Sequence, residues 1–330
     1  MREGLLGWST DMLVRLDDEC PGVLGRVLTA SAGRRQAIFA ALAVRSDMSA
    51  AYPASDDLFP AGLGEIIRHG RVRDILRHAF ASVPEGLPGL LLRIGERPLP
   101  RPQDYLSLHR LAAGASIRSL DALRGNRISG RKLDVLAALD ARWHHANTLT
   151  RLDTPAEAMR FNAAVEFVQS VCSRADDEVV AAAIAAMAPS STLPCLLDRF
   201  VRRADRLPAH PIPVADNELR PLTTMRDYLE AARRYRNCLG SKLEHVAAGR
   251  LAIGEFRGEA LLEFRPLTAG GGAGWILWTI HGHRNSPVAC SVCEAAEQKC
   301  DLLGIPRIND AAGGARWRSF RSFTRQVDWD

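Results

Sequence analysis

The chain has 330 residues, of which 47% are apolar and 25% are charged. This balance argues against a disordered chain and is typical of a globular protein with two or three folding units. Asp11, Asp17, Asp18 and Glu19 interrupt the apolar run that a signal peptide needs, and two prolines break the longest uncharged stretch, residues 179–197. We therefore expect a cytoplasmic protein with no membrane segment and, since its seven cysteines are an odd number, reduced thiols.

Two proline-rich segments, residues 96–104 and 207–221, interrupt the apolar periodicity of the chain. Alternate prolines are incompatible with helix interiors and central strands, so both segments are predicted to be extended connectors. The predicted units are a helical unit over 1–95, a helical bundle over 104–206, an α+β domain over 221–304, and a basic and aromatic tail over 305–330.

The first two units have apolar residues at helical spacing. In the second unit, Thr154 and Glu157 flank Pro155 in the pattern of a capping box, which predicts a helix start. The apolar stripe that follows is Phe161, Val165, Val168 and Cys172. We expect these helices to form a platform for a protein partner. Residues 116–139 read as two short helices around a glycine turn, so a helix-turn-helix DNA reader is an alternative for this part.

In the third unit, the spacing of the apolar residues changes along the chain. A helix is predicted to begin after Thr223 or Thr224, and a second, short helix over 241–248 to end at Gly249. Three strands follow, with Arg257-Gly258 as a two-residue hairpin turn and the glycine-rich residues 269–274 as a longer one; the predicted strands are 251–256, 259–265 and 275–281. A last helix is predicted from Pro287 to Leu303. The fold class is thus α+β, with a three-stranded antiparallel meander flanked by helices.

Cys238 is the thiol that most resembles a nucleophile, since it lies at a helix start and close in sequence to several arginines. His281 ends the third strand and Asn285 follows it. A cysteine at a helix start, a later histidine and an amide that orients it are the order found in cysteine hydrolases and transferases.

A zinc site is the competing interpretation of the same region, with ligands from His281, His283, Cys290, Cys293 and Cys300. If residues 287–303 are helical, however, Cys293 and Cys300 fall on an apolar stripe toward the sheet. We therefore expect neither a metal nor a cofactor.

Basic residues are concentrated near the start of the third unit. Residues 199–250 hold eleven basic and six acidic side chains, which accounts for the whole net charge of +5. A local positive field favours an anionic partner such as nucleic acid, although a solvated helix face with i,i+4 ion pairs would have the same composition. The candidate contacts are Arg226, Arg233, Arg234, Arg236 and Lys242, together with Arg316, Arg318 and Arg321 in the tail, where aromatic residues alternate with arginine.

The sequence from about Tyr228 to Ile305 resembles the PcfJ-like domain family. The resemblance rests on Asn237-Cys238-Leu239, Gly249 eleven residues after the cysteine, Glu263 in a strand, and Gly282 followed by Asn285. It implies a bacterial protein of mobile elements such as plasmids and phages, or of defence against them, and it marks Glu263 as a further site residue. Lys242 and Thr279 depart from the family pattern, which has an aromatic residue and a glutamine there.

Three functions remain open from the sequence. The first is nucleic-acid binding by the basic α+β domain. The second is a cysteine-dependent hydrolase or transferase in which Cys238 attacks, His281 moves the proton and Asn285 orients the histidine. The third is a non-catalytic subunit of a larger protein complex.

Overall fold

The computed structural model describes residues 4–51, 62–114, 117–213, 217–269 and 272–307. The chain forms two compact units. Unit 1 contains residues 1–166 and 176–196, and unit 2 contains residues 167–175 and 197–330. The residues of the two expected helical units, 1–95 and 104–206, thus fall mostly within unit 1. No helix among the described residues is long and apolar enough to cross a membrane.

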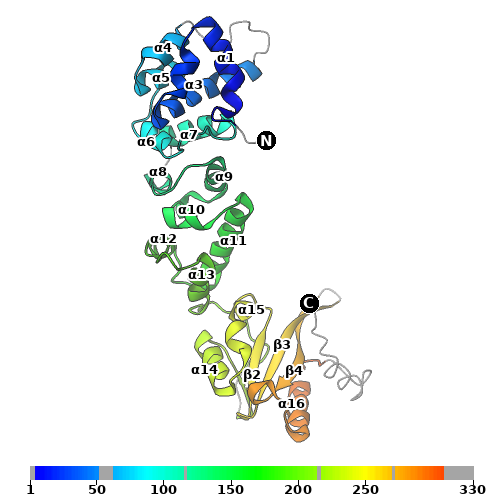
Figure 1. The fold of residues 1–330 in the computed structure, drawn as a ribbon. Coiled ribbons are helices and arrows are strands. Elements are labelled where there is room, and N and C mark those ends of the chain that lie inside the picture. The colour runs from blue at the N-terminus through cyan, green and yellow to red at the C-terminus, as the bar shows by residue number, and fades with distance from the viewer. Residues whose placement is uncertain (1–3, 52–61, 115–116, 214–216, 270–271, 308–330) are drawn as a thin grey trace. The chain divides into compact units, whose positions relative to one another are not determined.

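Unit 1 is helical, as the apolar periodicity predicts (Figure 1). Two helices, α11 and α13, begin in unit 1 and end in unit 2. The described helices from this part of the chain are α1 (Thr10–Glu19), α2 (Val23–Leu28), α3 (Ala32–Ala51), α4 (Leu63–His69), α5 (Val72–Ala79), α6 (Leu87–Leu92), α7 (Pro102–Gly114), α8 (Ile117–Arg124), α9 (Gly130–Ala138), α10 (Ala146–Arg151), α11 (Pro155–Val171), α12 (Asp177–Ala185) and α13 (Leu193–Val201), with short 3-10 helices η1 (Gly7–Ser9) and η2 (Ala141–Trp143).

Helix α3 lies against α2, α5, α6 and α7. Near its start, two adjacent arginines bind the carbonyl groups that two other helices leave unpaired at their ends. Arg34 donates to the carbonyls of Ile67 and Gly70 at the end of α4. Arg35, buried at 6% exposure, donates to the carbonyls of Leu28 and of other residues at the end of α2.

The proline-rich segment 96–104 is tied to α3 inside unit 1. The side-chain amide of Gln36 donates to the carbonyls of Gly95 and Arg97, and its oxygen accepts from the Tyr105 hydroxyl at 2.6 Å. That hydroxyl in turn accepts from the backbone N–H of Leu99. Pro98 and Pro100 lie before the first helix of this segment, whereas Pro102 is the first residue of α7, and several backbone polar groups of the segment are satisfied by buried side chains. It is therefore packed within a unit rather than being a free connector.

Helix α11 begins as the sequence predicts. The Thr154 hydroxyl accepts from the Glu157 N–H, and the Glu157 carboxylate accepts from the Thr154 N–H, so the capping box is confirmed. The stripe of Phe161, Val165, Val168 and Cys172 is buried.

Unit 2 contains a four-stranded antiparallel sheet in the order β1-β2-β3-β4. The α+β class is confirmed, but the expected count of three strands is wrong by one. The missed strand is β1, which lies in the predicted connector and pairs Arg220 with Glu255. Pro221 is compatible with it because β1 is an edge strand, where a proline N–H is not needed. The strands are β1 (Leu219–Pro221), β2 (Ala252–Phe256), β3 (Ala260–Ala269) and β4 (Gly272–His281).

The two faces of the sheet are covered by different helices (Figure 1). One face packs Phe256, Leu262 and Phe264 against Ala296 and Cys300 of the last helix. The other face carries alternate residues, among them Ile253, Glu255 and Glu263, and lies beneath the helices between β1 and β2. The helical elements of unit 2 are α14 (Met225–Tyr235), η3 (Cys238–Ser241), α15 (Leu243–Ala247), η4 (His283–Asn285) and α16 (Cys290–Leu302).

Most predicted boundaries in unit 2 are close to those observed. Thr224 caps α14, and Gly249 is left-handed after α15. Arg257 and Gly258, both at positive φ, form the hairpin turn. Two boundaries differ. Strands β3 and β4 continue into the glycine-rich segment as far as the pair Ala269 and Gly272, and α16 begins at Cys290 rather than at Pro287.

Candidate functional site

Cys238 is an exposed thiol at the start of η3, where the chain turns sharply after α14. Arg236 adopts a left-handed conformation and ends α14. The next residue, Asn237, accepts the backbone N–H of Leu239 on its side-chain oxygen at 3.1 Å and so caps η3. This short reversal brings Cys238 to the face of the sheet that carries Glu263.

A pocket of about 240 Å³ joins the four candidate catalytic residues of unit 2. Cys238 comes from η3, Glu263 from the middle of β3, His281 from the end of β4 and Asn285 from η4. In the register of the sheet, His281 pairs with Leu261 of β3. Glu263 lies two residues further along β3, so its side chain is on the same face of the sheet as those of Leu261 and His281. The lining residues are Asn237, Cys238, Leu239, Lys242, Ile253, Leu261, Glu263, His281 and Asn285.

Asn285 contacts the sulfur of Cys238. Its side-chain Nδ2 donates to Sγ at 3.7 Å. The sequence-based expectation was that this amide orients His281, whereas the observed contact is with the thiol. No hydrogen bond joins Cys238 to the His281 ring in the described part of the chain. The amide is therefore placed to stabilise negative charge on sulfur.

A tight turn holds Asn285 in place. The N–H of Ser286 donates to the carbonyl of His283, and the two residues between them, Arg284 and Asn285, have φ values of 57° and 56°. Asparagine tolerates this left-handed region, but arginine does so only at a cost. Strain of this kind persists where the surrounding structure imposes it, and it is concentrated at functional sites.

Replacing Arg284 with glycine should raise the free energy of unfolding by about 0.5–1 kcal/mol, since glycine adopts positive φ without steric cost. Denaturant unfolding of unit 2 measures the change. The matched control is H283G in the same turn, because the φ of His283 is not positive and the added flexibility should destabilise the protein. Equal effects of the two substitutions would contradict the assignment of strain to Arg284.

Glu263 is a buried carboxylate with a cation on each oxygen. Its side chain is 5% exposed; Lys242 Nζ lies 3.2 Å from Oε2, and Arg265 Nε donates to Oε1 at 3.0 Å. The Arg265 guanidinium also lies over the ring of Trp278, 4.3 Å from its centroid. Glu263 therefore fixes the position of Lys242 in the pocket wall.

His281 is half-buried in the same pocket. Burial lowers the pKa of its ring below the usual value; Lys242 lowers it further, while Glu263 raises it. Because the net shift is downward, the ring is neutral at pH 7 and can accept a proton.

The basic residues predicted to bind nucleic acid are largely paired with carboxylates. Arg226 pairs with Glu230, Arg234 with Glu255, and Lys242 with Glu263. Arg220, which the sequence did not single out, is a second partner of Glu255 at 3.1 Å. Arg233 and Arg236 are exposed. Arg316, Arg318 and Arg321 lie outside the described residues.

The alternative zinc ligands are not gathered into a site. In the part of the chain that the structure describes, no group of three or more His, Cys, Asp or Glu side chains is arranged to hold a metal ion. Cys300 faces the sheet, and burial raises the pKa of its thiol to about 12. Cys290 is exposed at the start of α16.

The predicted pair of short helices in residues 116–139 is present as α8 and α9. Its main basic residue has a structural role, however. Lys132 Nζ donates to the carbonyls of Leu149 and Leu152 at the end of α10, at 2.7 Å each. Asp134 on the same helix pairs with Arg101. These contacts do not favour α9 as a DNA-reading helix.

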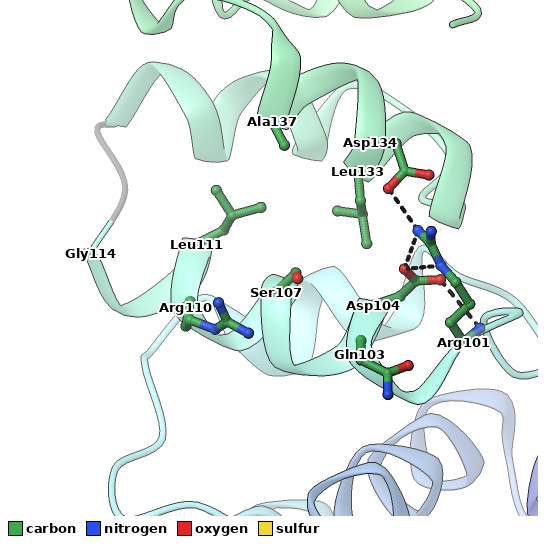
Figure 2. A pocket seen from close by; sticks show the side chains of 10 residues that line it. All are labelled: Arg101, Gln103, Asp104, Ser107, Arg110, Leu111, Gly114, Leu133, Asp134 and Ala137. Carbon is green, nitrogen blue, oxygen red and sulfur yellow. Dashed lines mark hydrogen bonds and ion pairs between the residues drawn. The ribbon is translucent and has the colours of Figure 1, made fainter. Parts of the chain in front are cut away.

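Unit 1 has a pocket that the sequence did not indicate. It measures about 680 Å³ and lies between α7 and α9. Figure 2 shows Leu111, Leu133 and Ala137 along it and Arg101 at one end. Arg101 lies 2.6 Å from both Asp104 and Asp134, so its charge is compensated within the pocket wall. The contact between Arg101 and Asp134 in the pocket wall joins residues 33 positions apart, which no local pattern reveals.

No family model matches the chain, and neither a curated protein nor a solved structure matches it significantly. The PcfJ-like resemblance and its mobile-element context therefore stay predictions that rest on short motifs.

Proposed function

We propose that unit 2 is a cysteine-dependent acyl hydrolase or acyltransferase, with Cys238 as the nucleophile and His281 as the general base. The observation that supports this most directly is the single pocket lined by Cys238, His281 and Asn285, which come from three separate elements. A nucleophile, a neutral imidazole and an amide donor are the groups that covalent acyl transfer requires.

The chemistry follows from the position of each group. His281, neutral because of its burial, accepts the thiol proton as the sulfur of Cys238 attacks the acyl carbonyl. The Asn285 amide at 3.7 Å stabilises the charge that develops on sulfur. The proton then passes to the leaving group, and water or a second acceptor releases the acyl group from Cys238. In enzymes without bound substrate, the hydrogen bonds between catalytic groups are commonly longer than in the reacting complex.

Nucleic-acid binding by α14 has less support. Arg226 and Arg234 each form an ion pair with a carboxylate, which reduces the positive field that their number alone implies. Arg233 and Arg236 remain exposed and could attract an anion to this side of unit 2.

Alkylation of the seven thiols by iodoacetamide at pH 6 tests the proposed role of Cys238. We expect Cys238 to be labelled at least about tenfold faster than Cys195 and Cys290, because the imidazole and the amide favour a reactive sulfur. These two thiols are matched controls, since both are exposed as Cys238 is. Peptide mass spectrometry gives the rate at each position. Equal labelling of the three exposed thiols would overturn the proposal.

A further inference from the structure

Lys242 supplies the positive charge in the lining of the Cys238 pocket. Its ammonium group has three N–H donors, and among the described residues its hydrogen-bond partner is Glu263, at 3.2 Å. The Lys242 side chain is 35% exposed, so it is partly open to solvent.

The charges around Glu263 do not cancel. One carboxylate faces two cations, Lys242 and Arg265, so the cluster has a net charge of one positive unit. Arg265 lies over Trp278 outside the pocket lining, whereas both Lys242 and Glu263 line the pocket. His281, the other basic group of the lining, is neutral at pH 7 because of its burial. The charges of Lys242 and Glu263 therefore balance within the lining, and the surplus positive charge of the cluster lies directly beside the pocket, on Arg265.

Two further cations lie next to lining residues. Arg236 directly precedes Asn237, and Arg284 directly precedes Asn285; both arginines are exposed. Positive charge around a concave site raises the local concentration of anions and their rate of arrival. The pocket volume of about 240 Å³ is below the ~300–1,000 Å³ of sites that enclose a whole drug-sized ligand, so a short group fits.

We infer that the pocket binds a short acyl group that ends in an anionic oxygen group, a carboxylate or a phosphate, held by Lys242. This inference rests on the proposed function and names its substrate class. With an acyl thioester, the Cys238 sulfur forms a bond to the carbonyl carbon and the bond from that carbon to the leaving sulfur breaks. The Cys238 proton passes through His281 to the leaving thiolate, and no oxidant or reductant is consumed.

Three thioesters of N-acetylcysteamine test the inference: succinyl, butyryl and 3-phosphonopropionyl. Butyryl replaces the carboxylate of succinyl by a methyl group, and the phosphonate stands for a phosphate. We expect at least one anionic thioester to acylate Cys238 about tenfold or more faster than butyryl, equivalent to about 1.4 kcal/mol. Intact-protein mass spectrometry measures the rates, and the faster of the two anionic probes identifies the group.

The charge preference should disappear in the double variant K242M/E263Q, which removes the ammonium and its buried partner together and so leaves no buried carboxylate without a cation. Arg265 loses its carboxylate partner as well, but its side chain is 41% exposed, so its charge stays solvated. The matched control is K299M, since Lys299 is a part-buried lysine that also pairs with a glutamate, Glu218, but lies outside the pocket. The control should keep the preference. Circular dichroism of each variant verifies that it is folded.

The possible results separate the inference from the proposed function. Equal acylation rates for the anionic thioesters and the butyryl thioester would overturn the inference but not the acyl chemistry of Cys238. A preference for the anionic thioesters that persists in K242M/E263Q would have the same consequence. Absence of a Cys238 adduct with all three thioesters would overturn both.

Discussion

Replacing His281 with glutamine should slow the acylation of Cys238 by about 100- to 10,000-fold, the usual contribution of a general base. Glutamine has a similar reach but cannot accept the thiol proton at neutral pH. Butyryl thioester at a fixed concentration is the simplest probe, because it does not depend on the charge preference of the pocket. The rate of adduct formation by mass spectrometry is the readout.

The pH profile distinguishes a base from a merely structural residue. Because burial lowers the pKa of His281, the acylation rate should rise through a pKa below the usual value of about 6.5 and then level off. The H281Q variant should lack this acid limb. An acid limb that is unchanged in H281Q would show that another group accepts the proton.

The same shift connects pH to the stability of unit 2. The unfolded chain binds a proton at His281 more readily than the folded one, so its contribution to stability is complete above about pH 6.5 and is lost as the pH falls through the folded pKa.

Replacing Arg35 with methionine should lower the free energy of unfolding of unit 1 by about 3–5 kcal/mol. Its guanidinium is buried and donates to the carbonyls of Val27, Leu28 and Ala30 at 3.0–3.2 Å. Methionine fills similar volume but removes the donor from the carbonyls of Leu28 and Ala30, while the Val27 carbonyl keeps the N–H of Ala30, and hydrogen bonds from a charged donor are among the stronger ones. Hydrogen exchange of the peptides that span α2 and α3 reports this unit separately from unit 2.

The control is R73M on α5, since Arg73 is exposed, and its replacement should change stability by less than about 0.5 kcal/mol. A loss in R35M no larger than in R73M would mean that water replaces the guanidinium at the end of α2.

The sequence is sufficient to predict elements whose signals are local. Thr224 and Asp227 form the capping box that begins α14, and Arg257-Gly258 turns the chain between β2 and β3 because both residues reach positive φ. The sequence misses strand β1 because Pro221 and the prolines before it indicate a connector, and only the pairing of β1 with β2 makes it a strand. The prediction of Pro287 as a first helical residue is wrong, because Asn285 and Ser286 belong to the turn that contacts Cys238 rather than to a helix cap.

The sequence names residues of the candidate site but does not indicate which of them contact one another. The order of Cys238, His281 and Asn285 along the chain was enough to name them, and one pocket contains all three. The contact of Asn285 with the thiol joins residues 47 positions apart in the chain, and the pairing of Lys242 with Glu263 joins residues 21 positions apart. Both are long-range properties, so neither has a signature in the local sequence.

The division of α11 between the two units determines where the protein can be truncated to obtain unit 2 as a fragment. Unit 2 includes residues 167–175, in which Ser173 donates its backbone N–H to the Asp205 carboxylate, as well as residues 197–330. A fragment cloned from the proline-rich segment onward would lack that stretch together with its partner Asp205. The shortest piece that keeps unit 2 whole begins at Thr154, the cap of α11, and carries α12 along with it.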